Sequence, residues 1–423
     1  MERKNAWAAY AGDDGRVEAF AKAYCDFINN GKTERECVAY GEKLAKAHGF
    51  EDLNAVVRSG RKLEAGARVY ANWMGKSFML FVLGEKPLEE GMNILGAHID
   101  SPRIDVKQNP LYEDTDLAYL DTHYYGGIKK YQWVAIPLAL HGVIVRKTGE
   151  KVIINIGEDE NDPVFCISDL LVHLAQEQMT KNAKEVVEGE ALNLIVGGRP
   201  LEGEEKDAVK ANVLKLLADK YGVEEEDFLS AELEIVPAGK ARDMGFDRSM
   251  ILAYGHDDRV CAYPSMMAVL DYEGTPEYTL CCIVTDKEEI GSVGATGMAS
   301  HYLENTVAEL YACTADYCEL AVRRCLRNSR MLSSDVSAGY DPNFASAFEK
   351  KNSAFLGRGI CFNKFTGSRG KSGSNDANPE FMASLRKIMD DEGVVFQTAE
   401  LGRVDLGGGG TIAKYMANHN IDT

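Results

Sequence analysis

The sequence has no apolar run that approaches the ~18–20 residues of a membrane span, and its N-terminus lacks the apolar centre of a secretion signal. Positive charge is also scarce: 47 Lys and Arg stand against 66 Asp and Glu, which gives a formal net charge of -19. A field of this sign repels phosphates. These absences predict a cytoplasmic protein that binds neither nucleic acid nor an anionic membrane.

The cysteines lack the paired C-x-x-C spacing that is typical of a structural zinc knot. Several of the ten lie in apolar runs that read as buried strand, with Cys281 and Cys282 as the clearest example. We expect reduced thiols in the core. Tandem repeats and low-complexity segments are lacking as well, apart from the local glycine run Gly407–Gly410.

The chain is long enough for two domains, because 423 residues exceed the ~100–200 of one ordinary domain and 45% of them are apolar. Residues 101–249 differ from their flanks in the pattern of apolar and charged residues. They contain short β-type runs, a helical stretch at 168–179 and an acidic segment at 202–227. This predicts an inserted domain. The flanks, 1–100 and 250–423, alternate apolar runs with helical stretches, which predicts one α/β domain with a largely parallel sheet.

The individual elements follow from the periods of the apolar residues. In the flanks, helical patterns are expected at 6–49, 259–272, 296–310 and 378–391, and strands at 69–73, 77–83, 93–98, 278–284, 359–362 and 394–397. In the insert, strands are expected at 133–140, 143–145 and 152–156.

Potential metal ligands follow or flank apolar runs at four places, which is where open α/β sheets hold their active sites. His98 and Asp100 come after the run 93–98. At a spacing of two they project to the same side of an extended segment, so the carboxylate can orient the imidazole. Asp257 and Asp258 open a helical stretch, where acids taken alone are more often caps of the helix dipole.

The other two places add three acids. Glu288 and Glu289 follow the run 278–284, and a turn there can aim one carboxylate at a metal and the other at water. Asp335 lies in a loop, where a single Asp is usually a turn residue. Taken together, one histidine and several carboxylates suit zinc, manganese or cobalt, and an acid able to bridge two ions indicates a pair ~3.5–4 Å apart.

Five motifs, in this order and spacing, resemble the aspartyl aminopeptidase and vacuolar aminopeptidase I family of di-zinc metallopeptidases. They are Ala97–Pro102, His256–Arg259, Asp286–Ser292, Ser334–Asp335 and Gly409–Ile412. The resemblance covers nearly the whole chain and is closer to the bacterial members. It implies an α/β metallopeptidase fold, an insert over 101–249 that mediates dimerisation, and a homododecamer that admits peptides.

The resemblance also implies a role for each matching residue. His98 and Asp335 would hold the first zinc, Asp257 would bridge the two ions, and Glu289 would hold the second zinc. Asp258 competes with Asp257 for the bridging position. Glu288 would be the general base that takes a proton from the metal-activated water, and Asp100 would support His98.

Substrate contacts are less closely defined by the resemblance. His173 aligns with a family histidine that reaches into a neighbouring subunit's site. A preference for N-terminal Asp or Glu needs a cation, and Lys364, Arg369 and Lys371 are the candidates. Ala338 stands where the animal enzymes have a substrate-contacting histidine, so their selectivity is not simply inherited.

A second departure concerns the second zinc. The family's remaining histidine lies beyond the glycine-rich turn, after a further strand, and His419 matches no ligand position. We therefore expect this 423-residue form to bind at most one metal well, at His98, Asp257 and Asp335, and to have little activity.

Two alternatives stay open at the level of sequence. One is another di-metal amidohydrolase, which the adjacent Glu288 and Glu289 alone do not exclude. The other is a catalytically impaired oligomeric scaffold that keeps the peptidase fold.

Overall fold

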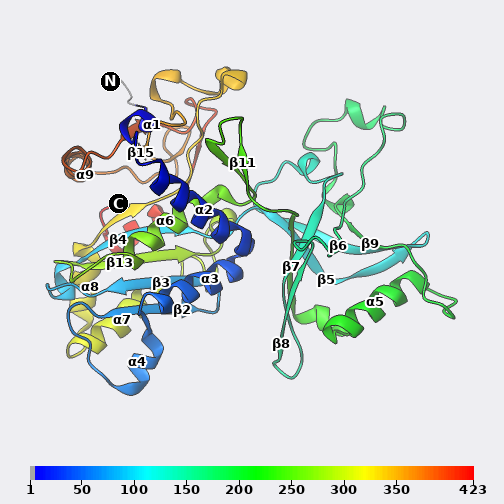
Figure 1. Cartoon of the computed structure of the whole chain (residues 1–423), viewed down its shortest axis with the longest axis horizontal. Coiled ribbons are helices and arrows are strands. Elements are labelled where there is room, and N and C mark those ends of the chain that lie inside the picture. The colour runs from blue at the N-terminus through cyan, green and yellow to red at the C-terminus, as the bar shows by residue number, and fades with distance from the viewer. Residues whose placement is uncertain (1–4) are drawn as a thin grey trace. The chain divides into compact units, whose positions relative to one another are not determined.

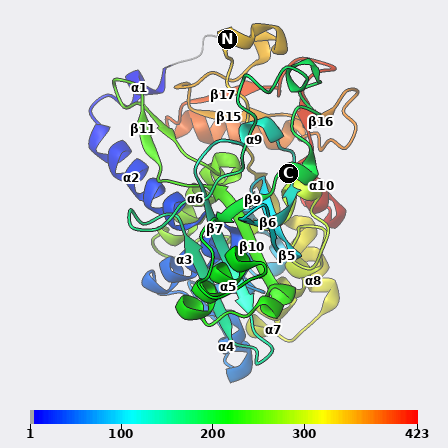
Figure 2. The same cartoon turned by 90° about the vertical axis from the view of Figure 1, so that its right-hand side faces the viewer.

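A computed structural model describes residues 5–423 of the chain, which fall into two compact units. The first unit consists of the residues up to Asp100 together with His256–Thr423, and the second is Ser101–Gly255 (Figure 1 and Figure 2). The second unit runs to Gly255, beyond the predicted 249, and within it strand β12 (Met250–Leu252) pairs with β11 (Arg242–Met244).

The first unit is built on a six-stranded sheet with the order β1-β2-β3-β13-β4-β14. These strands are β1 (Glu51–Asp52), β2 (Arg68–Trp73), β3 (Ser77–Val82), β4 (Met92–His98), β13 (Thr279–Thr285) and β14 (Arg330–Ser333). Strand β4 runs parallel to both of its neighbours, β13 and β14, whereas β3 is antiparallel to β2 and β13. The predicted α/β class is confirmed, and three parallel strands lie side by side at one end of the sheet.

Two groups of helices pack on this sheet (Figure 1). One group is α2 (Asp14–Asn30), α3 (Glu34–Ala47) and α6 (His256–Leu270), and the other is α4 (Leu53–Ser59), α7 (Tyr302–Thr314) and α8 (Glu319–Asn328). Neighbouring side chains of β3 pack against different groups of helices. Phe78 lies against Gly41 of α3, whereas Met79 belongs to the core that contains Leu310 of α7. Burial on both faces explains why these strands are continuous apolar runs in the sequence.

The helical pattern over 6–49 forms three separate helices, α1 (Ala6–Ala9), α2 and α3. The last break is set by Thr33 and Glu36, which form a capping box at the start of α3. Helix α7 begins at Tyr302 and not at 296, and α8 was not predicted.

In the remainder of the unit, β15 (Ile360–Asn363) pairs in parallel with β17 (Phe396–Ala399), and β16 (Gly367–Ser368) pairs with β18 (Gly408–Gly409). Helices α9 (Pro379–Asp391) and α10 (Ala413–Met416) complete it.

The second unit holds an antiparallel six-stranded sheet with the order β8-β7-β10-β5-β6-β9. Its strands are β5 (Arg103–Asp114), β6 (Leu117–Tyr125), β7 (Leu138–Val145), β8 (Lys151–Ile156), β9 (Leu194–Gly197) and β10 (Ala231–Pro237). Helix α5 (Ala208–Tyr221), within the acidic segment, packs on β5, β6 and β9 and buries Val209 (Figure 2). The run at 133–140 becomes strand only from Leu138 onward.

The helix predicted at 168–179 is wrong. This segment consists of turns, with a single 3-10 turn at Gln178–Thr180. Its apolar side chains are largely exposed, with Leu171 at 56% and Val172 at 74%. A short helix in water is marginal unless an apolar face packs on something, and these side chains have no such surface in the described chain.

Two further predictions concern the state of the cysteines and the lack of a membrane-spanning helix. None of the ten cysteines, all of which the structure describes, forms a disulfide, and Cys37, Cys281, Cys282, Cys313 and Cys325 are buried, as expected of core thiols. Within residues 5–423, none of the helices combines the length and the apolar character needed to cross a bilayer.

Candidate metal centre and active site

The predicted ligands gather where the three parallel strands end. His98 is the last residue of β4, Asp335 follows β14 by two residues, and Glu288 and Glu289 form a 3-10 turn (Glu288–Ile290) just after β13. Asp257 lies at the start of α6. Because parallel strands end at the same edge of a sheet, residues distant in sequence meet at one place.

His98 is 2% exposed, and its two ring nitrogens face different carboxylates. Nδ1 lies 3.2 Å from Oδ1 of Asp100 and 3.0 Å from that residue's carbonyl oxygen. Nε2 lies 3.2 Å from Oδ1 of Asp257 and 4.0 Å from Oε2 of Glu288. Burial alone would lower the pKa of His98, but the carboxylates of Asp100 and Asp257 outweigh it and hold that pKa well above its usual value.

Asp100 connects the histidine to the glutamate turn. Its fully buried carboxylate accepts the backbone N–H of Glu288 at Oδ1 and that of Glu289 at Oδ2, each at 3.1 Å. The same Oδ1 faces Nδ1 of His98. One side chain therefore fixes the imidazole and the direction in which both glutamates leave the backbone.

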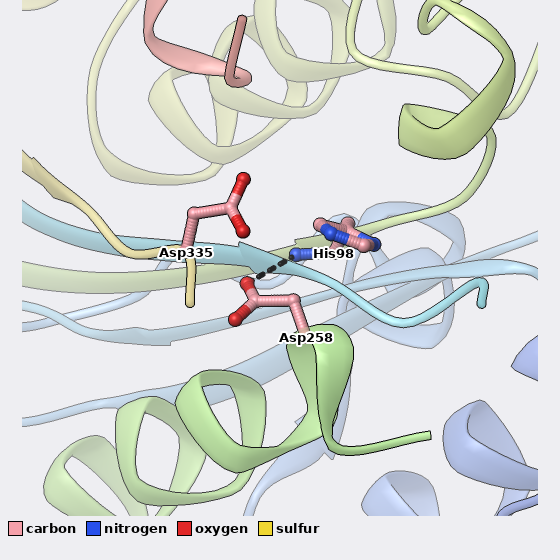
Figure 3. Close-up of side chains that lie close together, drawn as sticks. All are labelled: His98, Asp258 and Asp335. Carbon is pink, nitrogen blue, oxygen red and sulfur yellow. Dashed lines mark hydrogen bonds between the residues drawn. The ribbon is translucent and has the colours of Figure 1, made fainter. Parts of the chain in front are cut away.

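The adjacent acids Asp257 and Asp258 face different surroundings. Asp258 is fully buried, and its Oδ2 accepts the backbone N–H of His98 at 3.3 Å (Figure 3). The side chain of Asp257 is 49% exposed and lines the cavity described below, which Asp258 does not. Both acids come close to the histidine, from different sides.

In this cluster, two sets of ligand atoms lie close enough to hold a metal ion, with all members of a set within 4.8 Å of one another. The first is His98, Asp258 and Asp335, which Figure 3 shows converging from three different elements. The second is His98, Asp257 and Glu289. Each set combines an imidazole nitrogen with carboxylate oxygens, which is a donor set that suits zinc.

The electrostatics of this cluster favour a cation. Burial, followed by the neighbouring carboxylates, raises the pKa of Asp335 to about 6, that of Glu288 to about 7 and that of Glu289 to about 8. His98 opposes each shift, but one imidazolium cannot balance so many acids. A divalent ion placed among them would offset the repulsion, so the residues present fit the metal.

A cavity of about 740 Å³ opens over the cluster. The cluster contributes four acids to its lining: Asp257, Glu288, Glu289 and Asp335. The opposite wall comes from two loops that meet through the β16–β18 pairing, 365–371 and 400–411. The glycine run and the motif Gly409–Ile412 marked the end of the second loop in the sequence, and Thr411 of that motif lines the cavity. Arg403, which also lines the cavity, lies outside both patterns.

The predicted substrate residues are less well gathered. Lys371 lines the cavity, with Nζ 3.1 Å from Asp376 and 3.9 Å from the ring centroid of Phe365. Ala338 also lines the cavity, but Lys364 is not among the lining residues. His173 is exposed and belongs to the second unit.

His419 is also placed by the structure. Its Nδ1 lies 3.1 Å from Oε1 of Glu304 on α7. It is therefore paired outside the two sets of possible ligands around His98.

An α/β sheet with one histidine and several acids at the ends of its parallel strands defines a metal-dependent hydrolase of the zinc-peptidase class. The model of the family described as aminopeptidase I zinc metalloprotease (M18) matches residues 27–423, and the chain belongs to this family. The matching relatives are named aminopeptidases, and the family is described as zinc metalloproteases, which supports the expected metal-dependent aminopeptidase activity.

Sequence relatives and solved structures agree with this assignment. A probable M18 family aminopeptidase 1 from Clostridium acetobutylicum is 58% identical, over 99% of this chain and 90% of the relative. The crystal structure of an M18 aminopeptidase from Thermotoga maritima superimposes with a TM-score of 0.94 at 43% identity, covering all of this chain and 92% of that one. A Saccharomyces cerevisiae protein described as the mApe1 dodecamer, at 19% identity and a TM-score of 0.73, shares the fold over 96% of this chain and 88% of that one.

Proposed function

We propose that the protein releases N-terminal residues from peptides at the cluster around His98, with Glu288 as the general base. The observation that carries this proposal is the convergence of His98 and four cavity-lining carboxylates at one end of a hydrolase-type sheet. The metal ligands would be His98, Asp257, Glu289 and Asp335. Zinc bound there would polarise the scissile carbonyl and lower the pKa of water.

Asp257 is the better candidate than Asp258 for a ligand shared by two ions. Its carboxylate faces both Nε2 of His98 and the cavity. Asp258 already uses Oδ2 to accept the backbone N–H of His98, and it is fully buried. We infer that Asp258 holds the end of β4 in place while Asp257 binds metal.

Two metal positions would share Asp257. In the proposed assignment the first position would add His98 and Asp335, and the second would add Glu289. The ligand atoms around His98 that lie within 4.8 Å of one another form different sets, which are His98 with Asp258 and Asp335, and His98 with Asp257 and Glu289. The proposed assignment therefore differs from these sets in placing Asp257 and not Asp258 beside Asp335.

Glu288 is suited to move a proton. Its Oε2 lies 4.0 Å from Nε2 of His98 and its side chain lines the cavity, so it lies beside the proposed metal without being one of its ligands. Without metal, burial and the neighbouring acids raise its pKa to about 7. As base it would take a proton from the attacking water. As acid it would then return that proton to the leaving amine.

We further propose a preference for acidic N-terminal residues. Three cationic side chains line the cavity: Arg369, Lys371 and Arg403. A carboxylate in a peptide's first side chain would find a charge-assisted partner among them. Lys364, which does not line the cavity, is the weakest of the sequence-based candidates.

Assembly completes the proposal. The second unit would mediate dimerisation, and dimers would form a dodecamer in which His173 approaches the site of a neighbouring subunit. The exposed apolar segment around His173, with Leu171 and Val172 uncovered, supports a contact there. The mass of the particle in solution, measured by light scattering, tests this, since a monomer at micromolar concentration would contradict it.

The experiment that tests the function pairs metal analysis with hydrolysis. Dialysed protein is assayed for zinc per chain and for release of reporter groups from Asp-, Glu-, Leu- and Lys-aminoacyl substrates, beside Glu288→Gln. We expect hydrolysis that the variant lacks, at unchanged zinc content. Zinc binding without any hydrolysis would favour the impaired scaffold.

A further inference from the structure

The turn that carries Glu288 and Glu289 is short and closed on itself. Its flanking residues, Lys287 and Gly291, have left-handed backbone conformations, with φ of 70° and 95°. The N–H groups of Ile290 and Ser292 donate to the carbonyl of Lys287 at 3.3 and 2.7 Å, and that of Gly291 donates to the carbonyl of Glu288 at 2.9 Å. These bonds set the shape of the turn but not its orientation in the protein, which contacts with other elements must hold.

Asp100 supplies the contact at the start of the turn, through the backbone N–H groups of Glu288 and Glu289. The end of the turn is held by a different element. The hydroxyl of Tyr415, on α10, donates a hydrogen bond of 2.7 Å to the carbonyl oxygen of Gly291. Both ends of the turn are thus tied to side chains that lie far away in the sequence.

Helix α10 provides a fixed base for this tyrosine. Ile412, Ala413 and Met416 are at most 5% exposed, and Ile412 and Met416 belong to the same core as the strands of the sheet. Ile412 also lies against Gly96 of β4, the strand that ends in His98. The position of the hydroxyl is therefore tied to the strand that carries the histidine.

We propose that Tyr415 is a positioning residue for the glutamate turn, and that its hydroxyl keeps Glu288 and Glu289 aimed at the cavity. The consequence for catalysis rests on the proposed function, whereas the mechanical role does not. Thr411, four residues before Tyr415, lines the cavity, so the segment 411–415 links the cavity wall to the turn.

Tyr415→Phe tests the proposal because it deletes one oxygen and keeps the ring. Tyr311→Phe is the matched control, since the hydroxyl of Tyr311 donates to Glu89 at 3.0 Å away from the cavity. The two variants remove the same group. Only Tyr415 contacts the turn.

Two measurements are needed. In metal-free protein, Tyr415→Phe should speed hydrogen–deuterium exchange in a peptide covering 286–293 by about three- to tenfold, which is what the loss of one net hydrogen bond allows. In zinc-loaded protein, kcat should fall by a similar factor with KM nearly unchanged, because misaimed glutamates weaken the transition state more than substrate binding. Tyr311→Phe should change neither.

The outcomes separate the inference from the function. Unchanged exchange and unchanged kcat in Tyr415→Phe would overturn the inference. If Tyr415→Phe exchanges faster but the wild-type protein hydrolyses no substrate, the role of Tyr415 is upheld and the proposed function is rejected. A rise in KM alone would also reject the inference, because it would place Tyr415 in substrate binding.

Discussion

The two walls of the cavity are built in different ways. The wall of acids is fixed from behind: His98, Asp100 and Asp258 are almost fully buried, and the carboxylates of Asp100 and Asp258 accept backbone N–H groups at the ends of the strands. The facing wall consists of loops with exposed apolar side chains, such as Val404 at 74% and Leu406 at 62%. The first wall is organised for fixed chemistry, whereas the second has exposed positions that can vary, apart from the segment 411–415 that is linked to the glutamate turn.

The largest expected effect lies on the fixed wall. Glu288→Gln should lower kcat by about 10²–10⁴-fold, because it removes the proposed proton acceptor while keeping the shape of the side chain. Zinc content should stay the same, since Glu288 is not a proposed ligand. Glu277→Gln, at an exposed residue paired with Lys86, is the control. Turnover by Glu288→Gln near the wild-type rate would require a different base.

The pair Asp257→Asn and Asp258→Asn separates binding from support. A residue that only supports a metal ligand typically costs about 10–100-fold in metal affinity when it is replaced. We expect Asp257→Asn to weaken zinc binding at both positions by more than this factor. Asp258→Asn should weaken it by no more than this factor. Titration of each metal-free variant with zinc measures the difference. The reverse order would assign the shared ligand to Asp258 and reject our choice.

Asp100→Asn should have an intermediate effect. An amide cannot accept hydrogen bonds at both of its polar atoms, so one of the contacts to His98, Glu288 or Glu289 is lost. We expect activity to fall by about 10–100-fold, with weaker zinc binding. Parallel measurements of kcat and zinc affinity check this. A fall in neither would show that the buried carboxylate is dispensable.

The smallest effect is expected on the variable wall. Lys371→Met should reduce kcat/KM for Asp and Glu reporters a few-fold, since an exposed cation already paired with Asp376 contributes about 1 kcal/mol or less. Leu reporters should be unaffected. Lys364→Met, outside the lining, serves as its control. Equal losses on all reporters would mean that Lys371 does not read the substrate's charge.

The same contrast explains how far the sequence could be interpreted. The ligand-bearing ends of β4 and β13 were predictable, because a buried strand leaves a continuous apolar run and the acids follow it directly. Strand β14 was not predicted, because its apolar run is only Met331 and Leu332. The hydrogen bond from Tyr415 to Gly291 was not, because no local pattern links residues more than a hundred positions apart. The turns at 168–179 were misread as a helix because periodicity does not reveal whether a packing surface exists.

Other predictions stay predictions. These include the roles of the individual ligands, the dodecamer, the contact made by His173 and the cytoplasmic location. The choice between Asp257 and Asp258 rested on resemblance in the sequence, and the exposed side chain of Asp257 now adds a physical reason for it.

The shared anchor at Asp100 has a consequence for anyone who wishes to redesign this enzyme. Because one carboxylate holds both His98 and the backbone of Glu288 and Glu289, an engineer cannot retune the proposed metal ligand without also moving the proposed proton carrier. Libraries that vary this edge of the sheet should therefore diversify Asp100 together with its neighbours. Libraries aimed at new substrates can leave that edge untouched and vary exposed positions of the two facing loops, such as Val404.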